Sequence, residues 1–188
     1  MKTINEVWKL VENFELIQVH IEEMEAIYKR VFEFEKPFVV EIGSAHGASS
    51  TILAEAVKEL QGHLICIDHF PENYYSQALF GSYAKAAFLK NTAPYRDVME
   101  HVEVNSHQAI RWLRGGTTID VLFVDGDHEY DGVKKDCEDY MPLIKSGGYM
   151  AFHDYNNVGF GVKKAVDEML VGWEKSDDVW DLAIFKKP

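Results

Sequence analysis

Acidic and imidazole side chains gather in two short stretches of the sequence, at points where apolar runs end. Residues 125–130 read DGDHEY, and His153 and Asp154 stand together further along. Clustered carboxylates repel one another and are costly to desolvate, so stability alone gives no reason for them. A hard divalent cation such as Mg²⁺ would compensate this repulsion, because it prefers one or two carboxylates together with water and substrate oxygens. The pattern therefore favours chemistry assisted by a metal ion.

The residue types in the two stretches suggest separate roles. Asp125 and Asp154 are the best-placed metal ligands, and Asp127 or His153 would supply a third. His128, three residues after Asp125, is a candidate general base because an imidazole titrates near neutral pH. A purely structural interpretation stays open, in which Asp127 and His128 cap the next helix and His153 is a buried core residue. The predicted catalytic residues are Asp125, Asp127 and His128, and the predicted metal ligands are Asp125, His153 and Asp154.

A glycine-containing turn follows the first apolar run. Residues 41–47 read EIGSAHG, with Glu41 two positions before the first glycine. Glycine permits a tight turn and a close approach of the backbone to a ligand. The second run ends at Asp68, 21 residues after Gly47, where a carboxylate can accept hydrogen bonds from both hydroxyls of a ribose. Together these features favour a nucleoside site over a plain strand-to-helix turn, although Asp68 alone would equally suit a helix cap.

The third run is followed by Ser106 and His107, which could frame an adenine but also suit a helix N-cap. The predicted cofactor-binding residues are Glu41, Gly43, Ser44, Ala45, Gly47, Asp68, His69, Ser106, His107 and Asp125. An NAD(P)-dependent oxidoreductase would share such a ribose-binding acid. It would also want the glycine fingerprint GxGxxG, which this turn lacks, so it is the second choice.

Five short apolar runs, rich in β-branched and aromatic residues, lead into these polar stretches. They are residues 38–42, 64–68, 102–104, 121–125 and 149–154. Such runs are typical of parallel strands that are covered on both faces. Helical apolar patterns separate them, over residues 52–60, 109–113, 133–144 and 162–169. The alternation predicts a doubly wound α/β fold, in which ligands bind at the carboxyl ends of the strands.

The N-terminal part of the chain departs from this alternation. Residues 1–35 carry apolar stripes at helical spacing and are predicted to form a helical extension to a domain over residues 36–188. The stripe from Ile17 to Val31 is long for a helix that covers only its own sheet. We therefore expect a homo-oligomer, with a homodimer as the simplest form.

The C-terminal part departs from it as well. Residues 172–177 and 181–186 read as two strands without a helix between them, so we expect an antiparallel hairpin at one edge of a mostly parallel, seven-stranded sheet. Gly115-Gly116 and Gly147-Gly148 stand where helices should stop. The aromatic-rich segment from Phe70 to Phe88 would form either a lid over the site or a core helix.

Composition narrows the partners and the compartment. The chain has 31 acidic against 19 basic residues, and a formal net charge of −12 repels nucleic-acid phosphates and anionic membrane surfaces. No apolar run approaches the roughly 20 residues that a transmembrane helix needs, and the first residues lack a signal-peptide core. Cys66 and Cys137 are expected to be buried reduced thiols. The sequence thus favours a cytoplasmic protein that acts on a small molecule.

Residues from about 36 to 170 resemble the class I S-adenosylmethionine-dependent methyltransferases. The turn Glu41-x-Gly43-x-x-x-Gly47, the acid Asp68 and the terminal hairpin match that class. Within it, VDGDHEYDGVKKD followed by SGGYMAFHDY resembles methyltransferase family 24, which is similar to the macrocin-type sugar O-methyltransferases. The paired DGDHEY and HDY motifs are much more specific than the glycine turn.

The resemblance implies S-adenosylmethionine as cofactor and methyl transfer to a hydroxyl of a small molecule such as a sugar or glycoside. In the similar sugar enzymes an Asp after the fourth strand and acids after the fifth hold Mg²⁺, and a His three residues after the first ligand is the proposed base. Asp125, Asp154 and His128 occupy those positions here. Two departures stand out: His153 replaces an acid found in some of those enzymes, and Ala45 replaces a glycine found in many relatives. A non-catalytic nucleotide-binding module is the alternative from another class, and it would predict an eroded acidic cluster.

Overall fold

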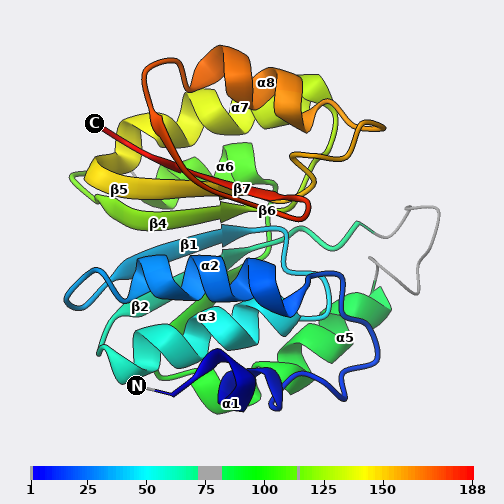
Figure 1. The fold of residues 1–188 in the computed structure, drawn as a ribbon. Coiled ribbons are helices and arrows are strands. Elements are labelled where there is room, and N and C mark those ends of the chain that lie inside the picture. Colours follow the sequence, from blue (N-terminus) through cyan, green and yellow to red (C-terminus); the bar gives the residue numbers. More distant parts are fainter. Residues whose placement is uncertain (1, 72–81, 114) are drawn as a thin grey trace.

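The chain folds around one seven-stranded sheet, as Figure 1 shows. The structure is a computed structural model that describes residues 2–71, 82–113 and 115–188. The strands are β1 (Phe38–Ile42), β2 (His63–Ile67), β3 (Met99–Val102), β4 (Ile119–Val124), β5 (Ile144–Phe152), β6 (Glu174–Val179) and β7 (Leu182–Lys186). Their order across the sheet is β3-β2-β1-β4-β5-β7-β6. β1 to β5 pair in parallel, whereas β7 runs antiparallel to β5 and to β6. The predicted doubly wound sheet with a C-terminal hairpin is confirmed.

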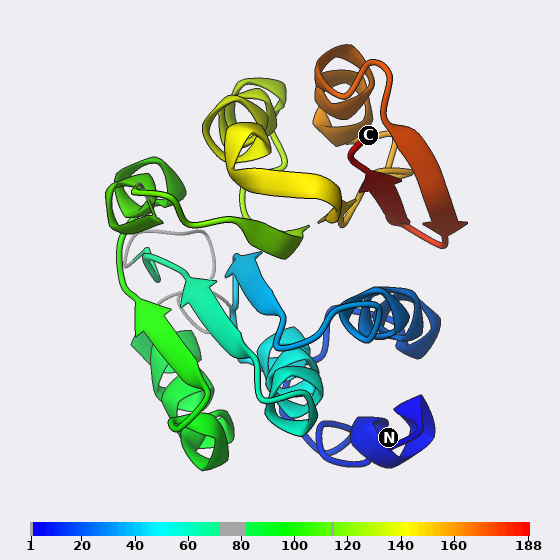
Figure 2. The ribbon, with the colours of Figure 1, turned by 90° about the vertical axis from the view of Figure 1, so that its left-hand side faces the viewer.

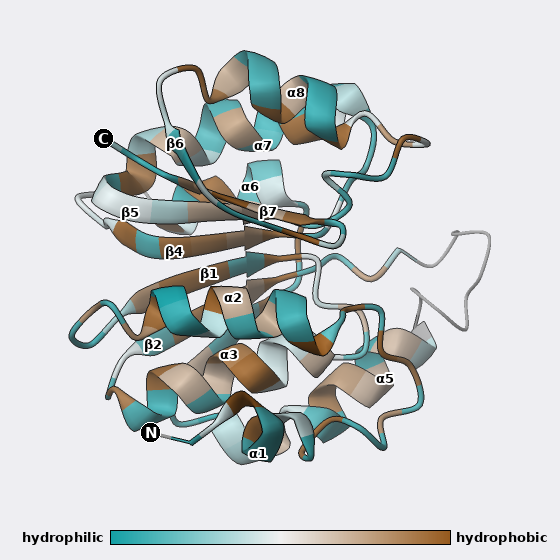
Figure 3. Cartoon of the chain, viewed as in Figure 1, coloured by the Kyte–Doolittle hydropathy of each residue, from teal (hydrophilic) through white to brown (hydrophobic). Residues whose placement is uncertain are grey.

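Helices cover both faces of the sheet, which explains why its central strands are apolar throughout. On one face lie α1 (Ile4–Trp8), α2 (Ile21–Val31), α3 (Ala48–Glu59) and α5 (Ser82–Asn91), and on the other lie α6 (Ser106–Leu113), α7 (Tyr130–Tyr140) and α8 (Val162–Met169). Successive strand residues belong to two different hydrophobic cores. Val39 lies in the core under α2 and α3, and Val40 lies in the core under α6, α7 and α8. Figure 3 shows the resulting brown, apolar central strands between helices with teal outer faces.

The N-terminal part is less helical than its apolar stripes predict. Helix α1 ends at Trp8, turns follow, and α2 begins only at Ile21. The prediction of helix over all of residues 1–35 was therefore wrong, because an apolar stripe fits a turn packed on a core as well as it fits a helix. The stripe on α2 packs within the chain, since Met24, Ile27 and Val31 are fully buried. This internal packing accounts for the feature that suggested a dimer.

Two other sequence predictions misplaced element boundaries. Strand β3 lies at Met99–Val102, a few residues before the apolar run at 102–104. Strand β5 begins at Ile144 and contains Gly147 and Gly148, which were expected to end a helix. Helix α7 instead ends before a short 3₁₀ turn at Met141–Leu143, which contains a proline. Gly147 stays in the strand because its amide donates to the carbonyl of Lys187 while its φ is +77°.

The sheet order places a binding site at the junction of β1 and β4. The chain leaves β1 towards α3 on one face and leaves β4 towards α7 on the other, so the two connections diverge. Such a switch point opens a crevice at the carboxyl ends of parallel strands. No helix in the described part of the chain is long and apolar enough to cross a membrane. Cys66 and Cys137 are buried and free, as expected.

Candidate active site

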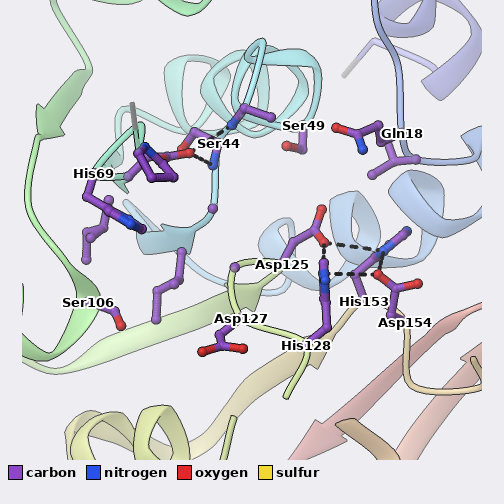
Figure 4. A pocket seen from close by; sticks show the side chains of 18 of the residues that line it. Gln18, Ser44, Ser49, His69, Ser106, Asp125, Asp127, His128, His153 and Asp154 are labelled. Atoms are coloured by element: carbon purple, nitrogen blue, oxygen red, sulfur yellow. Dashed lines mark hydrogen bonds and ion pairs between the residues drawn. The ribbon is translucent and has the colours of Figure 1, made fainter. Parts of the chain in front are cut away.

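A cavity of about 870 Å³ opens at the carboxyl ends of the parallel strands. Its wall includes the turn after β1, the ends of β2 and β4, and the loops that follow β3, β4 and β5. The N-terminal segment between α1 and α2 closes another side through Leu16, Gln18 and Val19. Figure 4 shows side chains from all of these segments pointing towards one space. The polar stretches singled out in the sequence thus converge.

The turn after β1 requires glycine at its first position. Gly43 has a φ of +85°, and a Cβ atom there would lie 2.1 Å from the carbonyl oxygen of Asp125. The loops after β1 and β4 can therefore touch only because this residue has no side chain. Ala45 also has a positive φ, +41°, a conformation that glycine adopts more readily than alanine. Gly43, Ser44 and Ala45 line the cavity, whereas Gly47 lies at the start of α3 outside the lining.

Glu41 holds the turn in place through hydrogen bonds and does not line the cavity. Its side chain is fully buried and accepts hydrogen bonds from Ser44 Oγ at 2.8 Å, from Ser49 Oγ at 2.6 Å and from Ser50 Oγ. Burial raises the pKa of this carboxyl above its ordinary value, although the three hydroxyls oppose the shift. The structure therefore makes Glu41 a positioning residue for the turn and for the start of α3, not a direct contact of a ligand.

Asp68 joins the ends of β1 and β2. Its Oδ2 atom accepts from the backbone amides of Ser44 at 2.9 Å and Ala45 at 3.0 Å, and its Oδ1 atom accepts from Phe70 N at 2.8 Å. A carboxylate has about four acceptor sites, so Asp68 can still receive hydrogen bonds from a ligand in the cavity that it lines. His69 lies beside it on the cavity wall with an exposed side chain.

Ser106 and His107 begin α6 and line the cavity between the ends of β3 and β4. Ser106 Oγ donates to Asp136 Oδ1 at 2.7 Å, and His107 Nδ1 lies 3.1 Å from Asp139 Oδ2. The neighbouring Asn105 accepts from the His107 amide through its side chain, so the N-cap role falls to Asn105. Both predicted residues reach the cavity while contacting acids of α7.

Two carboxylates and two imidazoles form a compact cluster at the other end of the cavity (Figure 4). The Asp125 Oδ1 and Asp154 Oδ2 atoms lie 3.6 and 3.2 Å from His128 Nε2. The same two oxygens lie 3.4 and 3.2 Å from His153 Nδ1. Burial alone raises the pKa of each carboxyl, but the imidazole contacts outweigh it and leave both pKa values below their ordinary range. Asp154 is held here with a φ of +56°, an uncommon conformation for a residue with a side chain.

His153 is a fixed cation within this cluster. Its Nε2 atom lies 3.3 Å from Glu23 Oε2, so both ring nitrogens face carboxylates. Burial lowers the pKa of His153, but Asp125, Asp154 and Glu23 outweigh that effect and raise the pKa to about 12. An imidazole with both nitrogens engaged leaves none for a metal ion, so the structure does not fit the predicted metal-ligand role of His153.

Glu23 is the functional residue that sequence reasoning missed. It is fully buried at the first turn of α2, where it accepts from the amides of His20 at 2.7 Å and Asp181 at 3.0 Å besides contacting His153. One carboxylate thus ties α2, the β7 hairpin and the cluster together. The available signal was an acid three residues after a helix N-cap, which alone indicates only a capping box.

His128 lies on the cavity side of the cluster. Burial lowers its pKa, but Asp125 and Asp154 outweigh that effect, so the pKa is raised above its ordinary value. Its Nε2 atom is buried and makes no hydrogen bond of good geometry with another described group, although Asp154 Oδ2 lies only 3.2 Å away. The ring stacks on Phe160, with centroids 4.7 Å apart.

A divalent cation fits this arrangement. Ligand atoms of Asp125, His128 and Asp154 all lie within 4.8 Å of one another, and the unaligned Nε2 atom of His128 faces the space between the two carboxylates. Two carboxylates with water and an acceptor oxygen are the donor set that Mg²⁺ prefers. The residues present therefore fit a cation. The nitrogen ligand beside the two carboxylates would come from His128 and not from His153.

Asp127 stands apart from this cluster. Its Oδ1 atom accepts from the Glu129 amide at 2.8 Å, immediately before α7 begins. Gly132 faces the same carboxylate, because a Cβ atom there would lie 2.2 Å from Asp127 Oδ2. The structure therefore favours the capping interpretation of Asp127 over the predicted catalytic one, although the residue lines the cavity.

Comparison with known proteins identifies the fold and the family. The model of a methyltransferase domain family matches residues 40–155. Uncharacterized protein R132 of Acanthamoeba polyphaga mimivirus is 29% identical over 137 residues, and the match covers 67% of this chain and 55% of that protein. The chain thus spans about half the length of this curated relative.

Solved methyltransferase structures share the fold. A candidate caffeoyl-CoA O-methyltransferase from Staphylococcus aureus superposes with a TM-score of 0.73 at 21% identity, over 100% of this chain and 93% of that one. The O-methyltransferase NovP gives 0.72 at 17% identity, over 91% and 81% of the two chains. The S-adenosylhomocysteine-bound methyltransferase PaMTH1 from Podospora anserina gives 0.70 at 15% identity, over 98% and 87%.

The family match extends from the middle of β1 to the residues just after β5, so it contains Asp68 and the Asp125, His128, His153 and Asp154 cluster. It spans more than half of the chain. This chain accordingly belongs to the class I S-adenosylmethionine-dependent methyltransferases, in the family defined by that methyltransferase domain.

Proposed function

We propose that the chain transfers the methyl group of S-adenosylmethionine to a hydroxyl of a small molecule. One observation carries the proposal: a single cavity joins the turn and Asp68 at one end to the unaligned His128 and its two carboxylates at the other. Transfer from a nucleoside cofactor to an acceptor needs a nucleoside-binding end and an acid–base end in one cavity.

The cofactor end holds the nucleoside through hydrogen bonds. Asp68 accepts from the ribose hydroxyls, while the turn at residues 43–45 lets the backbone approach the methionine part. Ser106, His107 and His69 form the wall at the adenine. When bound, S-adenosylmethionine supplies a methyl group on a positively charged sulfur.

The acceptor end removes the proton. The acceptor oxygen forms a bond to the methyl carbon while the carbon–sulfur bond breaks, the electron pair of that bond stays on sulfur, and the hydroxyl proton passes to His128. Asp125 and Asp154 stabilise the resulting imidazolium, whose charge they already favour. The same two carboxylates would hold Mg²⁺, which would lower the pKa of the acceptor hydroxyl.

Two structural neighbours whose names state an acceptor support the choice of acceptor class. The Staphylococcus aureus structure is named for caffeoyl-CoA, and CalS11, with a TM-score of 0.66 at 16% identity over 97% of this chain and 92% of that one, is a TDP-rhamnose 3'-O-methyltransferase. Both names describe transfer to oxygen. This supports a phenolic or sugar hydroxyl as the acceptor group here.

The test is transfer of labelled methyl from S-adenosylmethionine to a panel of glycosides, nucleotide sugars and catechols, with Mg²⁺ or with a chelator. We expect at least one acceptor to be methylated and the chelator to lower its turnover. His128→Ala should lower kcat ~10²–10⁴-fold, the usual contribution of a general base. His63→Ala is the matched control, because His63 starts β2 at the opposite end of the strand from the cavity. Equal rates for the two variants would remove His128 from the mechanism, and full activity with the chelator would remove the metal.

Our proposal also keeps two expectations from the sequence, a cytoplasmic location and a homodimer. Buried, free Cys66 and Cys137 suit a reducing compartment. Exposed Trp112 and Val171 supply apolar surface, with relative accessibilities of 62% and 81%. Sedimentation at micromolar concentration distinguishes a dimer from a 21.5 kDa monomer.

A further inference from the structure

The cavity has a strongly one-sided charge. Five carboxylates line it, and among the described residues no lysine or arginine does. They are Asp68, Asp125, Asp127, Glu129 and Asp154. Residues 72–81, which lie outside the described part, contain no lysine or arginine either. Even with His128 and His153 protonated, negative charge remains in excess.

Two lysines of a neighbouring hollow do not reverse this charge. Lys163 and Lys164 line a separate, shallower hollow of about 320 Å³ that shares Asn157 and Phe160 with the main cavity. Lys163 Nζ donates to Tyr155 OH at 2.8 Å and lies 3.3 Å from Asp167 Oδ2, so its charge is partly compensated. Lys164 Nζ lies 4.6 Å from the centre of the Tyr130 ring. Both lysines therefore contact side chains that do not line the main cavity.

The acceptor end also offers apolar surface. Phe160 stacks on His128 while 41% of it stays exposed. Leu16 and Val19 line the cavity from the N-terminal segment. The loop that carries Phe160 is fixed, because the amides of Phe160 and Gly161 donate to Asn157 O at 3.1 Å and His128 O at 2.9 Å. A flat ring entering the cavity would find an aromatic surface beside the proposed base.

We propose that the part of the acceptor that enters this cavity is neutral or positively charged, carries no phosphate or carboxylate near the reacting hydroxyl, and presents a flat apolar face to Phe160. The inference rests on the function proposed above and narrows its acceptor. An anion entering the cavity would face this excess of carboxylates where solvent screening is weaker than in bulk water. A nucleotide sugar or a coenzyme A ester would have to keep its phosphates outside.

Three catechols that differ only in charge test the proposal: 3,4-dihydroxybenzylamine, 3,4-dihydroxybenzyl alcohol and 3,4-dihydroxybenzoate. Each is titrated calorimetrically into protein saturated with S-adenosylhomocysteine, with and without Mg²⁺. We expect the amine and the alcohol to bind, and the carboxylate to bind about tenfold more weakly or worse, as one repulsive charge in a partly screened site would cause. Raising the ionic strength should reduce this difference in affinity, because salt screens the repulsion.

A charge reversal at the rim locates the effect. Glu129 lines the cavity with an exposed side chain, whereas Glu138 lies further along α7, away from the cavity. Glu129→Lys and Glu138→Lys change the net charge equally. We expect Glu129→Lys to reduce the difference in affinity between 3,4-dihydroxybenzoate and 3,4-dihydroxybenzyl alcohol. Glu138→Lys should leave this difference unchanged.

The outcomes separate the two proposals. If S-adenosylhomocysteine does not bind, both the proposed function and the proposed acceptor class are wrong. If it binds and the carboxylate then binds as well as the alcohol, or none of the three catechols binds, the acceptor class is wrong while the function stands. An equal effect of Glu129→Lys and Glu138→Lys would also overturn it, because net charge alone would then explain the selection.

Discussion

His128 and His153 look alike in the sequence but have different environments in the fold. Each imidazole contacts Asp125 and Asp154, yet only His153 has a third carboxylate, Glu23, on its other nitrogen. His153 is therefore a fixed positive charge that holds the carboxylates together. His128 keeps an unaligned nitrogen at the cavity, which suits proton transfer or cation binding.

Asp136 gives a pH-dependent contribution to stability. It is almost fully buried beneath Ser106, and burial raises its pKa from 3.8 to about 6. The folded state therefore keeps a proton that the unfolded state loses near pH 4. Its stabilising effect is present below pH 4 and is lost as the pH rises to about 6.

Asp136→Asn should remove this dependence while keeping an acceptor for Ser106. Relative to the unmodified protein, we expect the variant to gain up to about 3 kcal/mol in free energy of unfolding at pH 7, and much less at pH 4.5. Urea unfolding at the two pH values measures the difference. Asp139→Asn is the control, because Asp139 lies three residues further along the same helix, α7, and is less deeply buried. An equal gain at both pH values would show that Asp136 is ionised in the folded protein at pH 4.5.

At the scale of elements, α2 is part of the site although it precedes the matched family region. Glu23 connects the first turn of α2 to His153 and to the amide of Asp181, which lies just before the last strand, β7. We expect Glu23→Gln to lower the free energy of unfolding by about 1.5–3 kcal/mol, the range for a hydrogen bond to a charged group, because His153 keeps its contacts with Asp125 and Asp154. Urea unfolding measures this change.

Glu22→Gln is the matched control for this variant. Glu22 lies in the same helical turn and carries the same charge, but its side chain is exposed. We expect Glu22→Gln to change the free energy of unfolding by no more than about 0.5 kcal/mol. If the two variants lose similar amounts of unfolding free energy, Glu23 stabilises the protein through the helix dipole and not through its contact with His153.

The sequence predicted elements best where a local pattern had only one solution. The apolar runs of β1 and β4 fit only strands covered on both faces, and the helices α6 and α8 followed their apolar spacing. Residues 9–20 and the start of β5 were misassigned, because an apolar stripe also suits packed turns and a glycine pair also suits a strand. The lid or helix expected over Phe70–Phe88 is helical from Ser82 onwards, and residues 72–81 lie outside the described part.

At the scale of the whole molecule, sheet topology explains why the candidate site was partly predictable. Parallel strands deliver their carboxyl ends to one edge, so polar residues after β1, β2, β4 and β5 had to meet. Contacts made from outside that pattern could not be foreseen. Glu23 reaches His153 across 130 residues, and Leu16 and Phe160 enter the cavity from connecting segments without a local signature.

The central claim is that one end of the cavity binds a nucleoside cofactor and the other end serves the acceptor. Calorimetric titration of S-adenosylhomocysteine into the protein and into Asp68→Asn and Asp154→Asn tests it most directly, with NAD as the competing ligand. We predict stoichiometric binding to the unmodified protein and no binding of NAD. Asp68→Asn should weaken the affinity by about 1–3 kcal/mol, the range for a hydrogen bond to a charged group, and Asp154→Asn should leave it nearly unchanged. Binding of NAD without S-adenosylhomocysteine, or equal losses in the two variants, would contradict this account.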